Sequence, residues 1–146
     1  MMLMKAIVVG KLKDKMMQSR CDEYAKWIGS YAKLEVRELA DSTPEQEGQA
    51  IVRELDKDRN AYVVVLSEEG REFTTRQFAE HLGQLDRKVI FVIGGPYGHI
   101  PAVKQRANLL WSLSKLTFTH EIARLLLYEQ LFRAVNILHG GHYHNP

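Results

Sequence analysis

A glycine-rich segment at residues 93–98 (IGGPYG) is the first part of the sequence whose residue types suit chemistry. It directly follows a strongly apolar run and precedes a short predicted helix. In open α/β sheets, ligands bind at the carboxyl ends of strands, and glycines there let backbone amides approach a ligand closely. The segment matches neither the GxGxxG dinucleotide motif nor a Walker loop. A tight turn that needs positive φ explains the glycines equally well.

A second segment, residues 112–120 (SLSKLTFTH), offers hydroxyl groups and backbone donors between a predicted strand and the last predicted helix. It contains neither glycine nor proline, the residues that favour a simple turn. The alternative interpretation is a loop that caps the helix through Thr119. A third strand end, residues 66–70 (LSEEG), meets these two segments if the strands are neighbours, although its acidic pair alone is more typical of a solvated loop.

The C-terminal tail, residues 139–146 (HGGHYHNP), is rich in histidine. Zinc sites use such ligands, but a structural metal needs a fourth ligand and supporting hydrogen bonds, and the sequence shows neither. Composition alone favours a mobile terminus. If the tail instead folds over a site, Tyr143 and His144 can contribute stacking or proton transfer.

The elements that position these segments follow from apolar periodicity. Short runs rich in β-branched residues predict buried strands, and two weaker runs alternate. The predicted strands are Lys5–Val9, Leu34–Leu39, Ala61–Leu66, Lys88–Ile93 and Leu109–Leu113. Helical patterns fill the gaps between them. This order predicts an α/β fold, a parallel-rich sheet flanked by helices, in a single domain over residues 1–146.

The last predicted helix, about His120 to Leu138, is apolar almost all round. Its polar residues form two opposite stripes, which we interpret as solvent-exposed stripes between two apolar packing surfaces. One stripe consists of His120, Arg124 and Tyr128, and the other of Glu129, Arg133 and Asn136. This pattern predicts packing in two directions and contact with a partner subunit. Arg124 is suited to phosphate or to an interface ion pair, and Glu129 with Arg133 to a salt bridge at i,i+4.

Composition narrows the functional classes. The chain has 146 residues and a formal charge of +2, and 45% of its residues are hydrophobic, which argues against intrinsic disorder. A single cysteine, Cys21, rules out an internal disulfide and a cysteine-based zinc cluster. No apolar run reaches the roughly 20 residues that span a bilayer, and the N-terminal lysines follow the apolar stretch, the reverse of a secretory signal. We therefore expect a cytosolic enzyme or binding domain, and a pI near 8.7 is weak evidence for nucleic acid.

Three strings in this order and spacing carry a family resemblance: VIGGPYG, WSLSKLTFTH and EIARLLLYEQLFRAVNILHGGHYHN. They resemble the SPOUT-class large-subunit rRNA pseudouridine-N3 methyltransferases, the RlmH family, over essentially the whole chain. The resemblance implies a C-terminal trefoil knot, a fold that general topology rules would not propose. It also implies S-adenosyl-L-methionine as cofactor, a homodimer with the last helix at its interface, and the assembled ribosome as substrate. Neither DNA, a membrane nor a metal is expected.

The resemblance further implies a site in which the three strand-end segments surround one S-adenosylmethionine. The implied cofactor-binding residues are Leu66, Gly94, Gly95, Ser114, Lys115, Leu116, Thr117, Phe118 and Thr119. Three positions depart from the family pattern. Tyr97 stands where an acidic residue is usual, Thr119 where proline is usual, and Asn145 where a basic residue is usual, which puts a role for that basic residue in doubt.

The implied reaction moves the sulfonium methyl group to N3 of a pseudouridine, and N3 must first lose its proton. His144 is the first candidate for the base, with Tyr143 orienting or stacking on the nucleotide, and His120 is the second. Arg124 and Arg133 are candidate RNA contacts, and interface roles compete with this. Two other functions remain open: a knotted methyltransferase that acts on another RNA nucleotide or on a ribose 2′-oxygen, and a non-catalytic nucleotide-binding or ribosome-associated module.

Overall fold

The computed structural model describes residues 1–146 and contains one five-stranded sheet in the order β2-β1-β4-β3-β5. All neighbouring strands run parallel. The strands are β1 (Met2–Val9), β2 (Ala32–Leu39), β3 (Tyr62–Arg71), β4 (Val89–Ile93) and β5 (Leu109–Trp111). The predicted parallel α/β sheet is confirmed, while the threading of a knot stays a prediction.

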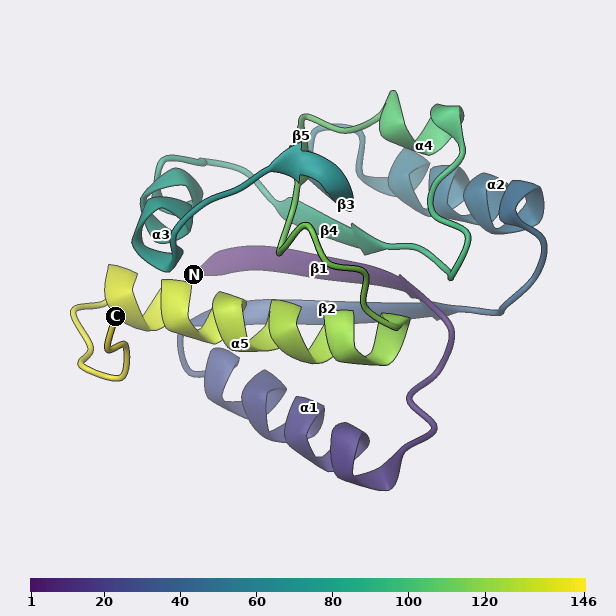
Figure 1. Cartoon of the computed structure of the whole chain (residues 1–146). Helices are drawn as coiled ribbons and strands as arrows, with labels where there is room; N and C mark the ends of the chain where they lie inside the picture. The colour runs from purple at the N-terminus through teal and green to yellow at the C-terminus, as the bar shows by residue number, and fades with distance from the viewer.

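Helices cover both faces of the sheet (Figure 1). The helical elements are α1 (Lys15–Ile28), α2 (Pro44–Leu55), the short 3₁₀ helix η1 (Asp56–Asp58), α3 (Thr75–Gly83), α4 (Pro101–Lys104) and α5 (His120–Leu138). On one face α5 packs between α1 and α3, and on the other face α2 packs with α4. Each layer encloses its own apolar core, the larger one beneath α5 and the smaller one beneath α2.

Threonine caps fix where three of these helices begin. The hydroxyl oxygens of Thr43, Thr74 and Thr119 accept hydrogen bonds from backbone N–H groups in the first turns of α2, α3 and α5. Each bond satisfies a donor that has no partner inside the helix. For α5, the cap at Thr119 sets the end of the 112–119 segment and the start of the helix at the expected residue.

Strand β3 is longer than its apolar run predicts. Residues 67–71 continue the strand instead of forming a loop, and the pairing with β5 becomes irregular between Leu66 and Arg71, which both lie opposite Trp111. Gly70 makes this possible, because a Cβ atom there would lie 2.5 Å from the Leu110 carbonyl carbon. The polar strand end therefore stays against the sheet and points its residues towards the neighbouring strand ends.

The prediction of two solvent-exposed polar stripes on α5 was wrong for Arg124, Tyr128 and Asn136, whereas His120, Glu129 and Arg133 are partly exposed. Arg124 and Tyr128 are 6% and 1% exposed, and Asn136 is also buried. Arg124 tolerates burial because its Nη1 donates to Glu38 Oε2 at 2.6 Å and its Nε donates to the Tyr128 hydroxyl at 3.3 Å. Tyr128 and the more exposed Glu38 thus supply the hydrogen-bond acceptors of Arg124, so sequence polarity alone did not show that this face of α5 is buried.

The expectation of a mobile tail was also wrong. After α5 the chain turns back beside the end of the helix (Figure 1). The backbone N–H of Tyr143 donates to Asn136 Oδ1 at 3.2 Å, and the N–H of Gly141 donates to the Asn136 carbonyl at 2.8 Å. The Tyr143 ring meets the Phe132 ring edge to face, with the ring centroids 4.7 Å apart. A buried asparagine and an aromatic contact therefore hold a segment whose composition suggests disorder.

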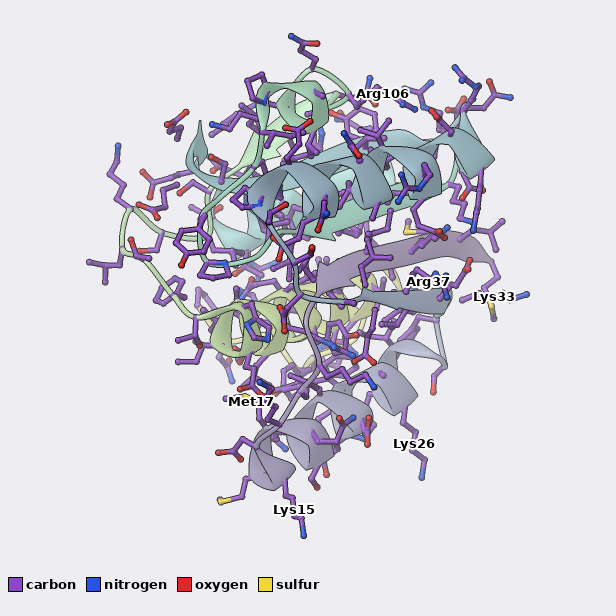
Figure 2. All side chains as sticks on the ribbon, turned by 90° about the vertical axis from the view of Figure 1, so that its right-hand side faces the viewer. Lys15, Met17, Lys26, Lys33, Arg37 and Arg106 are labelled. Atoms are coloured by element: carbon purple, nitrogen blue, oxygen red, sulfur yellow. The ribbon has the colours of Figure 1, made fainter.

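Charged side chains occupy the exposed edge of the sheet and the outer face of α1. Lys33 and Arg37 lie along the edge strand β2, while Lys15 and Lys26 extend from α1 (Figure 2). Charges on an edge strand discourage pairing with another chain. No helix in the structure combines the length and apolarity needed to cross a membrane.

Candidate functional site

A cleft of about 870 Å³ opens at the carboxyl ends of β3 and β4. Its walls are residues 66–69 at the end of β3, residues 93–99 after β4, and residues 113–121 between β5 and α5. The structure thus brings together the three segments that the sequence singled out. A cleft of this volume lies within the roughly 300–1,000 Å³ range of small-molecule sites.

Of the nine candidate cofactor-binding residues, eight line this cleft. They are Leu66, Gly94, Gly95, Ser114, Leu116, Thr117, Phe118 and Thr119. The ninth, Lys115, does not line it. Its side chain is 82% exposed and its Nζ lies 3.9 Å from Glu72 Oε1.

Two glycines form the turn after β4 because neighbouring side chains press against them. A Cβ atom on Gly94 would lie 2.7 Å from Cε1 of His99, and one on Gly95 would lie 2.6 Å from Oε1 of the buried Glu47. Positive φ occurs only later in the turn, at Gly98 (φ 77°). The first two glycines therefore serve close packing, while the third serves the turn itself.

The loop before α5 leaves most of its backbone polar groups unpaired. Residues 113–118 make no backbone–backbone hydrogen bonds. The Leu116 N–H donates to the Ser114 hydroxyl at 3.0 Å, and the Thr117 hydroxyl donates to Glu68 Oε1 at 2.8 Å, which joins the loop to β3. The Ser114 carbonyl accepts from the Ser112 hydroxyl at 2.8 Å, and the other N–H and C=O groups of residues 113–118 make no hydrogen bond within the protein.

His120 lies in the cleft at the junction of β1 and α5. Its Nε2 is 3.3 Å from the Lys11 carbonyl oxygen, and a Cβ atom on Gly10 (φ 93°) would lie 2.7 Å from the same nitrogen. The next residue, Glu121, accepts a hydrogen bond from the Lys13 N–H at 2.6 Å. These contacts fasten the end of β1 to the start of α5 and place an imidazole beside the cleft.

His144 and Tyr143 lie at the opposite end of α5 from this cleft. The helix has 19 residues, which at 1.5 Å per residue is about 28 Å long. Arg133 Nη1 lies 3.1 Å from His144 Nδ1, Arg133 also pairs with Glu129 at 3.0 Å, and its guanidinium lies over the Tyr143 ring. Burial, followed by the charge of Arg133, lowers the pKa of His144, so its imidazole is neutral at neutral pH. One subunit therefore holds this cluster far from its own cleft.

The two candidate RNA-contacting arginines differ in environment. Arg124 is buried and paired with Glu38, so an RNA contact would require this pair to break. Arg133 is partly exposed and lies in the cluster with His144 and Glu129.

Sequence reasoning did not single out two groups at the cleft. His99 lines it and donates from Nε2 to the Leu66 carbonyl at 3.1 Å, while Glu47 supports Gly95 from behind and accepts from the Ser42 N–H at 2.8 Å. The signal for His99 was its place one residue after a glycine turn. Glu47 gave no signal, because a glutamate in the first turn of a helix is common.

Comparison with known proteins identifies the family to which this chain belongs. A family model described as "Predicted SPOUT methyltransferase" matches residues 2–144, so the chain belongs to the SPOUT methyltransferase family. Proteins of this family are S-adenosylmethionine-dependent methyltransferases, and this chain is an enzyme of that class.

Within this class, the similar curated relatives share one name, "Ribosomal RNA large subunit methyltransferase H". The protein of Synechococcus sp. (strain RCC307) is 46% identical over 141 residues, which cover 96% of this chain and 92% of the relative. The protein of Gloeobacter violaceus is 38% identical over 152 residues, covering 99% of both chains.

Solved structures agree at the level of the fold. A probable methylase family protein from Haemophilus influenzae has a TM-score of 0.58 at 12% identity, covering 98% of this chain and 70% of that one. The SpoU methyltransferase AviRb from Streptomyces viridochromogenes, solved in complex with AdoMet, has a TM-score of 0.50 at 10% identity, covering 96% and 59%.

Proposed function

We propose that this enzyme methylates N3 of a pseudouridine in large-subunit ribosomal RNA, acting in the cytoplasm on the assembled ribosome as a homodimer. The relatives named as large-subunit rRNA methyltransferases support the substrate class. The observation that carries the proposal is the cleft in which eight of the nine expected binding residues meet.

The residues at the cleft fit S-adenosylmethionine. The cofactor supplies an electrophilic methyl group, and transfer by direct displacement depends mainly on positioning. The unpaired backbone groups of residues 113–118 and the turn at Gly94 and Gly95 would hold its nucleoside portion. Leu66 adds a further backbone carbonyl at the end of β3. These groups bind and orient, and none needs to react.

Removal of the N3 proton needs a base, and His144 is the first candidate. Burial and the charge of Arg133 lower the pKa of His144, so its imidazole is neutral at neutral pH. Its Nδ1 lone pair accepts from Arg133, so His144 would take the N3 proton only after the RNA draws Arg133 away. Tyr143 beside it would stack on the nucleotide, and Arg133 would contact the RNA as well as His144. His120 is the second candidate, because it lies in the cleft itself. Arg124 would serve through its pair with Glu38, which holds α5 against β2.

A homodimer would resolve the separation between the tail and the cleft. Ile122 is 40% exposed, and neither it nor the half-buried Leu126 one turn later packs against the core cluster beneath α5. An apolar strip on this helix is suited to a second copy of the chain. The tail of one subunit would then complete the cleft of the other.

Transfer of a tritiated methyl group tests the reaction. Ribosomes that lack the modification and naked rRNA are offered separately with labelled S-adenosylmethionine. We expect label in the large-subunit RNA of the ribosomes, mapped to a pseudouridine N3. Label at another nucleotide or at a ribose oxygen overturns the assigned position. Cofactor binding without label in either substrate overturns the RNA substrate, and absence of cofactor binding favours a module without catalysis.

Mixed dimers test which subunit supplies the base. Leu116→Trp changes an exposed residue at the cleft and is chosen to block cofactor binding, whereas His144→Ala removes the tail imidazole. Each homodimer should be inactive, with His144→Ala slowed about 100-fold or more in single turnover. If the tail acts across the interface, the mixed dimer contains one intact site and recovers activity. If it acts within one chain, every site in the mixed dimer lacks one component, and no activity returns.

A further inference from the structure

His99 bridges two strand ends that separate from each other at the cleft. The pairing between β3 and β4 ends at Val65 and Val92, just before Leu66 and the glycine turn. Beyond that point, the bond from His99 Nε2 to the Leu66 carbonyl is the one side-chain hydrogen bond that joins the end of β3 to the turn after β4. The imidazole also packs against Gly94, where a Cβ atom would lie 2.7 Å from Cε1.

The contacts of this ring define its protonation state. Nε2 faces a carbonyl oxygen, so it carries the hydrogen, and Nδ1 is therefore an acceptor. Nδ1 is buried and has no hydrogen-bond partner. A protonated ring would bury a second N–H without an acceptor, which is costly.

Burial and the charge of Lys104 also favour the neutral ring. Burial lowers the pKa of His99, the Leu66 carbonyl opposes this, and the positive charge of Lys104 lowers it further. Lys104 comes from α4 and pairs with Glu69 of β3 at 3.4 Å, while Glu47 of α2 approaches Gly95 in the turn. The ring is therefore neutral at neutral pH.

We propose that neutral His99 is a positioning residue for the cofactor: it ties the Leu66 carbonyl to the Gly94 turn, and the cleft binds the nucleoside portion of its ligand in this tied arrangement. The inference rests on the proposed S-adenosylmethionine site. A carbonyl has two lone pairs, so Leu66 can accept from His99 and from a ligand donor at once. Because that carbonyl is already fixed before the ligand binds, less conformational entropy is lost on binding and the affinity is higher.

Two substitutions separate the hydrogen bond from the bulk of the ring. His99→Gln keeps a side-chain N–H at a similar reach, whereas His99→Leu fills space without a donor. Titration calorimetry with S-adenosylmethionine at pH 7.5 should show about tenfold weaker binding for His99→Leu, the scale of one hydrogen bond, and near wild-type binding for His99→Gln. Thermal unfolding of each variant checks that the fold is retained.

The pH profile of affinity gives a second readout that a purely structural role would not move. Because binding needs the neutral ring, wild-type affinity should fall as pH drops below 6.5 through the lowered pKa, and His99→Gln should lack this acid loss. His81→Gln is the matched control. His81 is a second histidine with a lowered pKa, lies outside the cleft on α3 and bonds the Tyr62 hydroxyl at 3.0 Å, so this variant should keep the acid loss.

The outcomes distinguish this role from the function on which it rests. Wild-type protein that does not bind S-adenosylmethionine overturns both. Wild-type binding that His99→Leu matches overturns the positioning role alone. If His99→Leu does not fold, the glutamine variant decides: an acid loss equal to that of wild type overturns the role of His99, and a flat profile supports it.

Discussion

Asn136 is the residue that holds the C-terminal tail, and its removal should release the proposed catalytic cluster. It is 7% exposed, its Oδ1 accepts from the Tyr143 N–H at 3.2 Å, and its Nδ2 donates to the Tyr31 hydroxyl at 3.2 Å. The tail keeps the backbone bond from the Gly141 N–H to the Asn136 carbonyl in any variant, and the contact between Arg133 and His144 also remains. Asn136→Ala therefore loosens the tail without deleting its last backbone contact.

The magnitude follows from the single tail bond that is lost. A net hydrogen bond contributes about 0.5–1.5 kcal/mol, and 1.4 kcal/mol corresponds to a factor of ten. The Tyr143 amide in Asn136→Ala should therefore exchange with solvent about three- to tenfold faster. Hydrogen exchange followed by NMR measures this, with Asn145→Ala as the control, since Asn145 is exposed and makes no side-chain hydrogen bond.

Turnover links this local opening to function. If the docked tail supplies the base, Asn136→Ala should slow single-turnover methylation of ribosomes in proportion to the docked fraction that it loses, while calorimetry shows unchanged cofactor binding. Unchanged exchange at Tyr143 would refute the assigned hydrogen bond. A tail that NMR shows to be mostly undocked, with wild-type turnover, would refute the link between the docked tail and catalysis.

Three further predictions concern stability and the cleft. Lys5→Met should lower the free energy of unfolding in urea by about 1.5–3 kcal/mol, because it removes the charged hydrogen bonds from Nζ to Glu54 and Asp58, at 3.1 and 3.3 Å, while Lys57 and Lys88 still pair with these carboxylates; no change would refute a stabilising role. Burial would raise the pKa values of Glu54 and Asp58, but their ion pairs outweigh this effect and lower both values. The two carboxylates therefore stabilise the folded protein above pH 4.5, and this stabilisation is lost as the pH falls further. The difference in free energy of unfolding between wild type and Glu54→Gln should narrow between pH 5 and pH 2. Gly95→Ala should weaken cofactor binding because its Cβ meets Glu47, and Glu47→Ala in the same chain should restore part of the calorimetric affinity.

The apolar pattern of the sequence correctly predicted the elements whose residues are all buried. All five residues of β4 are buried and apolar, so its bounds followed closely from its sequence, and the single threonine cap before α5 fixed the start of that helix. The polar end of β3 was missed because its pairing depends on Gly70 and on the backbone of a distant strand. Such a contact is decided by tertiary packing and leaves no local pattern.

The candidate site was predictable to the extent that its binding groups are backbone atoms at strand ends. Parallel strands bring their carboxyl ends to one edge, which is why the glycine turn and the loop before α5 meet. His99 escaped because its role depends on the Leu66 carbonyl, 33 residues away in the chain. Arg124 was misplaced because its ion-pair partner, the more exposed Glu38, lies 86 residues away in β2, and no local sequence pattern indicates that contact.

The length of α5 constrains how the cleft and the tail can cooperate. His120 begins the helix beside the cleft, and the tail docks at its other end, about 28 Å away. A rigid helix cannot shorten that distance, and Asn136 fastens the tail where it lies. The tail can therefore serve chemistry at a cleft only if a second subunit lies antiparallel along α5, so that the end of one helix meets the beginning of the other. The apolar strip that contains Ile122 supports this arrangement, and it makes the proposed base and the proposed dimer a single hypothesis: evidence that the enzyme is active as a monomer would remove His144 from the mechanism and leave His120 as the base.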